Sequence, residues 1–96
     1  MKQPCVYILA SSPNGTLYIG VTGHLRQRIH QHRAGDIKGF TQRYNVKCLV
    51  YIETHDRMED AITREKRLKK WRRDWKIRLI EEHNPQWLDL FEHLNS

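Results

Sequence analysis

The segment from residue 5 to residue 22, CVYILASSPNGTLYIGVT, constrains the fold more than any other part of the chain. Two runs rich in β-branched and aromatic residues, at positions 6–9 and 17–21, flank the dipeptide Asn14-Gly15. Asn-Gly between two such runs is a strong short-range signal for a β-hairpin. The segment therefore predicts two antiparallel strands joined by a tight turn.

The length of this turn decides which residues of the hairpin face each other. A two-residue turn would pair Tyr7 with Thr22. Because side chains alternate between the two faces of a strand, four residues would then share one face of the ribbon: Tyr7, Leu9, Tyr18 and Gly20. One extra residue in the turn would flip one strand relative to the other and separate them.

Two tyrosines on one face of a hairpin have an ordinary structural explanation. Tyrosine is a good strand former and usually packs its ring in a half-buried sheet, which accounts for Tyr7 and Tyr18 without any function. Gly20 favours a functional explanation, because glycine inside a strand costs packing and often marks a close approach by another backbone or a ligand. It is equally compatible with a β-bulge, so the pattern leaves both explanations open.

A formal net charge of +6 and a pI near 9.6 indicate an anionic partner, with nucleic acid favoured over a membrane surface. The positive charge is concentrated between residues 64 and 78, where the only acidic residues are Glu65 and Asp74. The basic residues of this run are Arg64, Lys66, Arg67, Lys69, Lys70, Arg72, Arg73, Lys76 and Arg78. Such clustering is typical of phosphate contact, although a solvated helix face is the common alternative.

A chain of 96 residues predicts a single domain, residues 1–96, with a modest core that needs no disulfide or metal. The chain has no apolar run long enough for a membrane span and no signal-like segment, so we expect a cytoplasmic protein. Cys5 and Cys48 lie in strand-like stretches outside any Cys-x-x-Cys pair, which predicts buried free thiols without a catalytic role.

A helix is predicted after the hairpin, over residues 25–34, where apolar positions recur at helical spacing and Gly35 ends the pattern. Arg28 and His32 are four residues apart and therefore lie on one face of this helix. They are either exposed polar residues or the lining of a cleft above the hairpin. In a cleft, a guanidinium can hold a phosphate oxygen and an imidazole can donate or shuttle a proton.

Residues 36–45 are predicted to form a loop, in which Lys38, Phe40, Arg43 and Tyr44 interleave basic and aromatic side chains. This composition suits contact with a nucleic-acid strand, but the aromatic rings can equally anchor the loop to the core. Residues 46–53 are rich in β-formers and predict a third strand, which completes a small antiparallel sheet.

The next helix places a carboxylate in an unusual position. Apolar residues recur at helical spacing after residue 58, and Glu65 falls inside this apolar stripe, between Ala61 and Leu68. A carboxylate that faces the core is costly unless it is paired or binds a cation. Glu65 is therefore either the partner of a basic residue, with Arg28 or a lysine as candidates, or a ligand for a hard cation such as Mg²⁺.

The C-terminal third predicts two more helices. Trp71 and Trp75 are four residues apart, so they either stack on bases or, more commonly for such spacing, pack in the core. Asp74 is a candidate cap for a helix that continues through residues 77–80. Asn84 followed by proline has the form of an N-cap, which predicts a terminal helix after it.

Several short motifs in one order resemble those of the GIY-YIG nuclease superfamily, specifically its small stand-alone branch. They are Cys5-Val6-Tyr7, Tyr18-Ile19-Gly20, and the segments at 25–32, 64–66 and 84–90. The resemblance covers nearly the whole chain. In one departure, the first motif reads Cys-Val-Tyr in place of Gly-Ile-Tyr, which keeps the tyrosine and changes its neighbours.

The resemblance implies an α/β (α+β) fold, with a three-stranded antiparallel sheet flanked by helices, and a metal-dependent endonuclease that hydrolyses phosphodiester bonds in DNA. Tyr7 would match the general base, and Tyr18 the residue that orients water or phosphate. Arg28 would stabilise the charge of the transition state, and His32 would assist proton transfer. Glu65 would hold a single Mg²⁺ or Mn²⁺. Because a phenol titrates near pH 10, a Tyr7 base at neutral pH requires a pKa lowered by nearby cations or a proton relay.

Nucleic acid, most simply DNA, is the expected partner, and a monomer is the default expectation. The residues predicted to contact it are Lys38, Arg43, Lys66, Lys69, Lys70, Arg72 and Arg73. The alternative function is a non-catalytic nucleic-acid-binding module of the same fold, since the basic charge supports both. A protein-protein adaptor fits the charge poorly.

Overall fold

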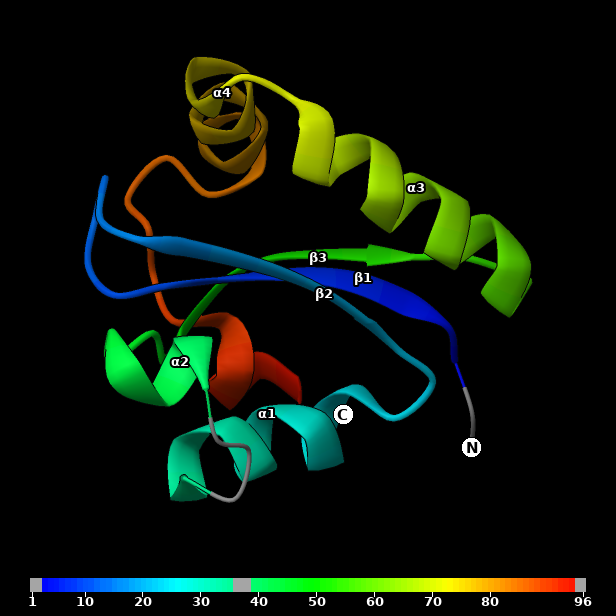
Figure 1. The fold of residues 1–96 in the computed structure, drawn as a ribbon, viewed down its shortest axis with the longest axis horizontal. Coiled ribbons are helices and arrows are strands. Elements are labelled where there is room, and N and C mark those ends of the chain that lie inside the picture. The colour runs from blue at the N-terminus through cyan, green and yellow to red at the C-terminus, as the bar shows by residue number, and fades with distance from the viewer. Residues whose placement is uncertain (1–2, 36–38, 95–96) are drawn as a thin grey trace.

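The protein is built in three layers, with a twisted β-sheet between two layers of helices (Figure 1). The computed structural model describes residues 3–35 and 39–94. The three strands are antiparallel and lie in the order β2-β1-β3. The elements are β1 (Cys5–Ala10), β2 (Leu17–Thr22), α1 (Leu25–Ala34), α2 (Phe40–Arg43), β3 (Cys48–Thr54), α3 (Met58–Lys70), α4 (Arg73–His83) and a terminal 3₁₀ helix, η1 (Leu90–Leu94). The predicted fold class is confirmed.

The β1–β2 hairpin forms as predicted, but its connection is longer than a two-residue turn. Residues 12–15 form the turn, in which the Gly15 amide donates to the Ser12 carbonyl at 2.8 Å. Pro13 holds the first central position, and Asn14 adopts a φ of 60° at the second, a combination typical of a type II turn. The proline therefore determines the turn, and the Asn-Gly dipeptide lies one position later than predicted.

The turn is centred one residue earlier than predicted, which changes the register of the hairpin without changing its faces. Tyr7 pairs with Gly20, and Leu9 pairs with Tyr18. The predicted pairing of Tyr7 with Thr22 is therefore wrong by two positions. Because side chains repeat every two residues along a strand, a shift of two leaves every side chain on its predicted face. The two tyrosines do share one side of the ribbon.

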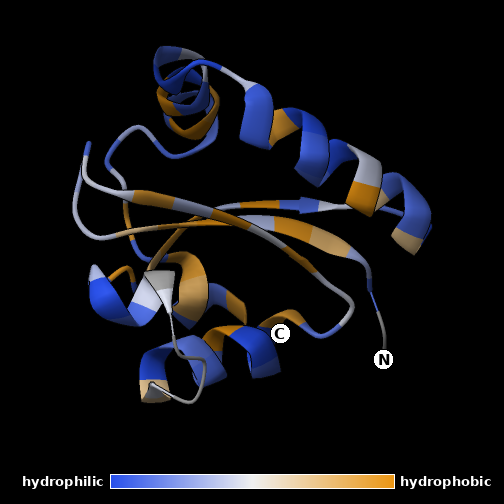
Figure 2. Cartoon of the chain, in the orientation of Figure 1, coloured by the Kyte–Doolittle hydropathy of each residue, from blue (hydrophilic) through white to orange (hydrophobic). Residues whose placement is uncertain are grey.

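The central strand β1 is buried along its whole length and separates two apolar clusters. On one face, Val6, Ile8 and Ala10 pack with residues of α3 and α4 such as Leu68 and Ile80. The opposite face, which carries Tyr7 and Leu9, packs against α1 and η1. Figure 2 shows these apolar residues along the strands, between the two layers of helices.

Strand β3 pairs with β1 through a bulge at Val50, since Ile8 pairs with Tyr51 but Leu9 pairs with Leu49. The carbonyl of Val50 accepts a hydrogen bond from the Asn84 side chain at 3.0 Å. Asn84 is thus a buried residue at the end of α4. The sequence-based prediction that it begins a terminal helix is wrong. The amide of Asn84 also binds both backbone groups of Leu88, which ties the last loop to the sheet.

Helix α1 ends at Gly35, which adopts the left-handed conformation with φ 77°, as predicted. The predicted loop at 36–45 is partly wrong, because residues 40–43 form the short helix α2. Asp74 lies in the first turn of α4, whose N-cap residue is Arg72. Both cysteines are free, with Cys5 buried and Cys48 half-buried. Across the described residues, none of the helices combines the length and the apolar character that crossing a bilayer requires.

Candidate active site

Tyr7 is a fully buried residue in the middle of β1, and its ring crosses the neighbouring strand at Gly20. A Cβ atom at Gly20 would lie only 2.4 Å from both Cζ and Oη of Tyr7. The glycine therefore marks a close approach, but by a side chain of the same sheet. Because β2 is the outer strand on this side, the missing side chain lets the phenol reach the sheet edge.

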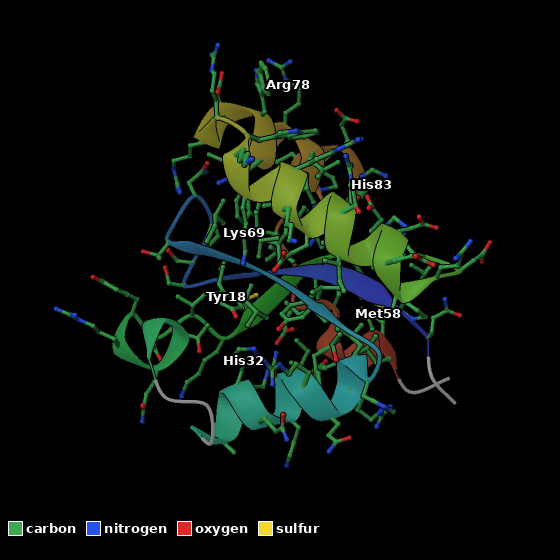
Figure 3. The ribbon with its side chains drawn as sticks, turned by 45° about the vertical axis from the view of Figure 1, so that its right-hand side comes forward. Tyr18, His32, Met58, Lys69, Arg78 and His83 are labelled. Atoms are coloured by element: carbon green, nitrogen blue, oxygen red, sulfur yellow. The ribbon has the colours of Figure 1, made fainter. Side chains whose placement is uncertain are left out.

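The rings of Tyr7, Tyr18 and His32 form a compact cluster at this edge. Their centroids are 6.3 Å apart for the two tyrosines, 5.9 Å for Tyr7 and His32, and 5.3 Å for Tyr18 and His32. The hydroxyl of Tyr7 lies 3.0 Å from Nε2 of His32, within hydrogen-bond distance. In Figure 3, Tyr18 of β2 lies between His32 of α1 and Lys69 of α3. The hairpin and α1 thus bring together three of the predicted site residues.

Thr41 completes a hydrogen-bonded chain that the sequence analysis did not identify. Its hydroxyl lies 3.0 Å from Nδ1 of His32, and both residues are buried. Thr41 belongs to α2, in the segment predicted to be a loop. A threonine nine residues after the histidine follows no local pattern, so only the tertiary structure connects them. Thr41 orients the imidazole, and because its hydroxyl can donate or accept, it can bond either neutral tautomer of His32.

Burial and Arg28 determine how these groups titrate. Burial raises the pKa of Tyr7 to about 12, an effect that the adjacent Arg28 guanidinium opposes and that nearby Tyr18 and Glu65 reinforce. Burial lowers the pKa of His32, and the positive charge of Arg28 lowers it further. At neutral pH the cluster therefore holds a protonated phenol and a neutral imidazole. The pKa of Tyr7 is raised, not lowered, which leaves a proton relay as the way for it to act as a base.

Arg28 reaches the same cluster from α1, as predicted. Its guanidinium lies close enough to the Tyr7 hydroxyl to affect the pKa of that group. Its Nε is buried and has no hydrogen-bond partner among the described residues. A buried donor without a partner is costly, and a phosphate oxygen is an acceptor that would satisfy it.

Glu65 of α3 approaches the cluster from the opposite layer. Its side chain is 12% exposed and pairs with Nζ of Lys69 at 2.9 Å. The predicted pairing with a lysine is therefore present. Lys69 also lines an open groove of about 340 Å³, together with Leu17, Tyr18, Ile19 and Lys76. The carboxylate thus lies beside a groove that contains Tyr18 and two lysines.

The donor set around Glu65 is compatible with one hard divalent cation. The described residues contain no group of three or more His, Cys, Asp or Glu side chains that could hold a metal ion. Glu65 would act as a single carboxylate ligand. Mg²⁺ commonly binds through one or two carboxylates and leaves its other positions to water and substrate phosphate. In this structure the carboxylate is paired with the Lys69 ammonium, which a divalent cation would displace.

Several predicted phosphate contacts are occupied by the protein itself. Arg73 donates to the carbonyls of Asn14 and Gly15, both at 2.6 Å, and so holds the hairpin turn. Arg72 pairs with Asp74 at 2.7 Å. Arg64, which is not among the predicted nucleic-acid contacts, points toward β3. Its partner there is Glu53, at 2.9 Å. These arginines have structural contacts that their sequence context does not reveal.

The other predicted contact residues are positioned differently. Lys66 and Lys70 are exposed on α3, and Lys69 lies at the Tyr18 groove. Arg43 is exposed at the end of α2, where its guanidinium lies 5.6 Å from the ring centroid of Tyr44. Lys38 lies outside the described residues. The assignment of this set to nucleic-acid contact stays a prediction.

Comparison with known proteins connects this geometry to a family. The family model described as "GIY-YIG catalytic domain" matches residues 3–78. UPF0213 proteins of Staphylococcus aureus and Staphylococcus haemolyticus are each 34% identical over 82 residues, covering 85% of this chain and 99% of the relative. The solution structure of a UPF0213 protein from Bacillus halodurans matches with a TM-score of 0.57 and 23% identity, over 98% of this chain and 99% of that one. That structural likeness supports the fold.

Proposed function

The chain belongs to the GIY-YIG domain family, and on that premise we propose that it is a metal-dependent endonuclease that hydrolyses phosphodiester bonds in DNA. Hydrolysis requires a base that activates water, positive charge that offsets the charge developing on the phosphate, and stabilisation of the leaving oxygen. Tyr7 and His32 are the candidates for the first requirement, and Arg28 and Glu65 for the other two.

The observation that carries the proposal is the hydrogen-bonded chain from Thr41 through His32 to Tyr7. In the tautomer whose Nδ1–H donates to Thr41, the Nε2 atom of His32 has a lone pair facing the Tyr7 hydroxyl. Tyr7 then takes a proton from the attacking water as it passes its own proton to His32. This relay avoids a free phenolate, which a tyrosine with a pKa of about 12 would rarely form at neutral pH.

The state of His32 suits the role of proton acceptor. Its lowered pKa keeps the imidazole neutral at pH 7, so that Nε2 is available. Its burial fixes the ring against Thr41 and so limits its reorientation. Tyr18 lies between this pair and the groove, where its hydroxyl can orient water or a phosphate oxygen.

Arg28 supplies positive charge for the reaction, and Glu65 supplies a carboxylate that would hold a divalent cation. The guanidinium of Arg28 donates to the phosphate oxygens, which carry increased negative charge in the transition state. A divalent cation, when bound, would supply Lewis-acid stabilisation of the phosphate and the leaving oxygen. Glu65 would hold that cation after releasing Lys69, and Lys69 would then be available for a phosphate in the same groove.

A non-catalytic nucleic-acid-binding module is the second candidate. The ion pair between Lys69 and Glu65 favours it, because a neutralised carboxylate repels phosphate less and binds a metal less readily. The raised pKa of Tyr7 also opposes a direct role as base. A module that only binds has no need for an acidic side chain beside its phosphate groove, however, and this favours the enzyme.

The experiment that tests the proposal is incubation of supercoiled, linear and branched DNA with the protein in Mg²⁺, Mn²⁺ or EDTA. Cleavage with either metal and none in EDTA is the expected result. A Tyr7→Phe variant purified in the same way serves as the control for contaminating nucleases. If the wild-type protein retards every DNA on a gel and cleaves none, the binding module replaces the enzyme. A parallel RNA series distinguishes the two kinds of substrate.

A further inference from the structure

A second groove, of about 300 Å³, lies on α4 and is separate from the site already described. Its lining residues are Trp71, Trp75, Arg78, Leu79 and Glu82. The four from α4 recur at helical spacing on one face of that helix. Ile80, the buried residue of α4, is about 140° around the helix from Trp75. Figure 3 shows Arg78 of α4 well separated from Tyr18 of β2.

The two tryptophans of this groove have different environments. Trp71 is half-buried and packs against the core cluster, as the packing explanation predicts. Trp75 is 43% exposed, so packing accounts for only part of its ring. The rings meet edge to face, with centroids 5.9 Å apart and planes at 86°. Trp71 therefore supports Trp75 in a fixed orientation, with part of the Trp75 ring in solvent.

The positive charges around Trp75 favour an anionic ligand, and the exposed ring of Trp75 favours a ligand with flat, uncharged rings. The guanidinium of Arg72 lies 5.3 Å from the Trp75 centroid, and Arg78 lines the groove. Glu82 is the acidic residue of the groove and disfavours a phosphate within it, so that the phosphate of a bound strand would lie toward Arg78, since Arg72 is paired with Asp74. An exposed aromatic ring beside cationic side chains is a common platform for stacking nucleic-acid bases.

The size of the groove excludes bulkier occupants. Grooves that receive an amphipathic helix must accept several anchor residues along its length, which a space of about 300 Å³ does not provide. One planar ring fits. We propose that this groove binds a single unpaired nucleobase of a nucleic-acid strand, which stacks on Trp75 while Arg78 contacts the flanking phosphate.

The proposal goes beyond cleavage and deepens the proposed function by naming a substrate feature. Bases within a duplex are stacked on their neighbours and unavailable to Trp75. The groove would therefore favour single strands, flaps or branched nucleic acids over an uninterrupted duplex. Base binding in this groove requires that the protein binds nucleic acid, but it requires no metal and no turnover. It can therefore be tested without metal and without cleavage.

The test is titration of the protein with short oligo(dT), oligo(rU) and a blunt DNA hairpin in EDTA, followed by tryptophan fluorescence and by anisotropy of labelled strands. Trp75→Leu should weaken oligo(dT) binding by roughly 5- to 150-fold, the range expected for loss of one stacked base. Trp75→Phe keeps a ring and should restore part of the affinity. Arg78→Gln should lower the magnitude of the log-affinity versus log-salt slope for a single strand by about 0.7. Trp75→Leu should leave this slope unchanged.

Leu88→Ala is the matched control, because Leu88 is a 54% exposed apolar residue outside the groove, and its removal should leave binding unchanged. Thermal unfolding of each variant identifies any loss of fold. Affinity for the hairpin should be equal in the wild-type and Trp75→Leu proteins. Oligo(dT) affinity within twofold of wild type in a folded Trp75→Leu protein would overturn the proposal. A second result would also overturn the proposal: self-association of the wild-type protein that Trp75→Leu abolishes, with oligo(dT) affinity unchanged. In that case a second copy of the chain, and not a nucleobase, would cover the groove.

The two proposals can fail separately. If a strand stacks on Trp75 but no nucleic acid is cleaved, the proposal of a base-binding groove stands and the proposal of an endonuclease fails. If cleavage depends on Tyr7 and Glu65 but Trp75→Leu does not affect strand binding, only the proposal of a base-binding groove fails. Comparison of oligo(dT) with oligo(rU) shows whether the bound strand is DNA or RNA.

Discussion

The ring of Tyr7 occupies the space that a side chain at Gly20 would need, since a Cβ atom there would lie 2.4 Å from the tyrosine Oη. Gly20→Ala should therefore displace the phenol from His32 and lower cleavage sharply. Overpacking of this kind costs roughly 1–3 kcal/mol of unfolding free energy. Denaturant unfolding measures that cost, and single-turnover cleavage measures the effect on the site.

A double-mutant cycle isolates the contact between the two residues. In a Tyr7→Leu background the ring is absent, so the added methyl group of Gly20→Ala should cost much less stability than in the wild type. An equal cost in both backgrounds would show that the strand itself, and not the Tyr7 ring, requires glycine at this position.

Tyr7→Phe and Arg28→Lys should each reduce turnover far more than DNA affinity, because both residues are proposed to act in the transition state. Loss of a general base commonly costs about 100-fold or more in rate. Lysine keeps the charge of Arg28 but cannot form its forked pair of hydrogen bonds. Binding and single-turnover rates are compared at saturating enzyme. If saturation restores the rate of either variant, its residue contributes only to binding.

How far the sequence predicts the site depends on how local each signal is. The faces of Tyr7, Tyr18 and Gly20 follow from the period of two along a strand, and remain correct although the register is shifted. Glu65 is found because it interrupts an apolar stripe. These signals depend on near neighbours in the chain, which is why sequence alone reveals them.

The features that the sequence does not reveal depend on distant contacts. Thr41 reaches His32 only because α2 folds back over α1, and no spacing rule predicts that contact. Arg73 looks like part of a basic surface, yet it holds the turn carbonyl of Asn14. Charge counting cannot separate a structural arginine from a phosphate-binding one, because the difference lies in partners far away in the chain.

The buried imidazole of His32 makes stability depend on pH. Its folded-state pKa is lowered, so between that value and the unfolded value of about 6.5 the unfolded chain binds more protons. The free energy of unfolding should therefore fall as the pH decreases from 7 toward 5. Each unit of pKa depression corresponds to about 1.4 kcal/mol at the acid limit.

Urea unfolding across this pH range, in the wild type and in His32→Gln, measures the effect. Glutamine is uncharged at every pH, so the variant should lose most of the slope between pH 7 and pH 5. His30→Gln is the matched control, because His30 is exposed on the same helix. An unchanged slope in His32→Gln would show that another group titrates in this window.

Glu65→Gln should abolish metal-dependent cleavage while leaving the fold intact. The substitution removes the charge that would hold a divalent cation but keeps the shape of the side chain. The pairing of Glu65 with Lys69 spans one helical turn and has an exposed partner, so its loss should cost only about 0.5 kcal/mol of unfolding free energy. Calorimetric titration with Mn²⁺ reports binding directly. Wild-type cleavage rates with unchanged metal dependence would exclude Glu65 as the ligand.

The basic run divides into residues that are available for phosphate and residues that the fold already uses. Lys70 is exposed, and Lys69, which lines the Tyr18 groove, becomes available once Glu65 releases it, whereas Arg72 is paired with Asp74. Each lost phosphate contact reduces the magnitude of the log-affinity versus log-salt slope for duplex DNA by about 0.9. Lys69→Gln with Lys70→Gln should therefore lower it by roughly two units, and Arg72→Gln by less than one.

Arg73→Gln should act on stability instead, because it removes two hydrogen bonds to the hairpin turn. A hydrogen bond contributes roughly 0.5–1.5 kcal/mol, and exposure keeps these two near the lower end, so a loss of about 1–2 kcal/mol is expected, with little change in the salt slope. Nitrocellulose filter binding over a salt series, combined with thermal unfolding, separates the two effects. A double lysine variant with an unchanged slope, beside an Arg73→Gln variant with a reduced one, would reverse the assignment and place the bound strand along the hairpin turn.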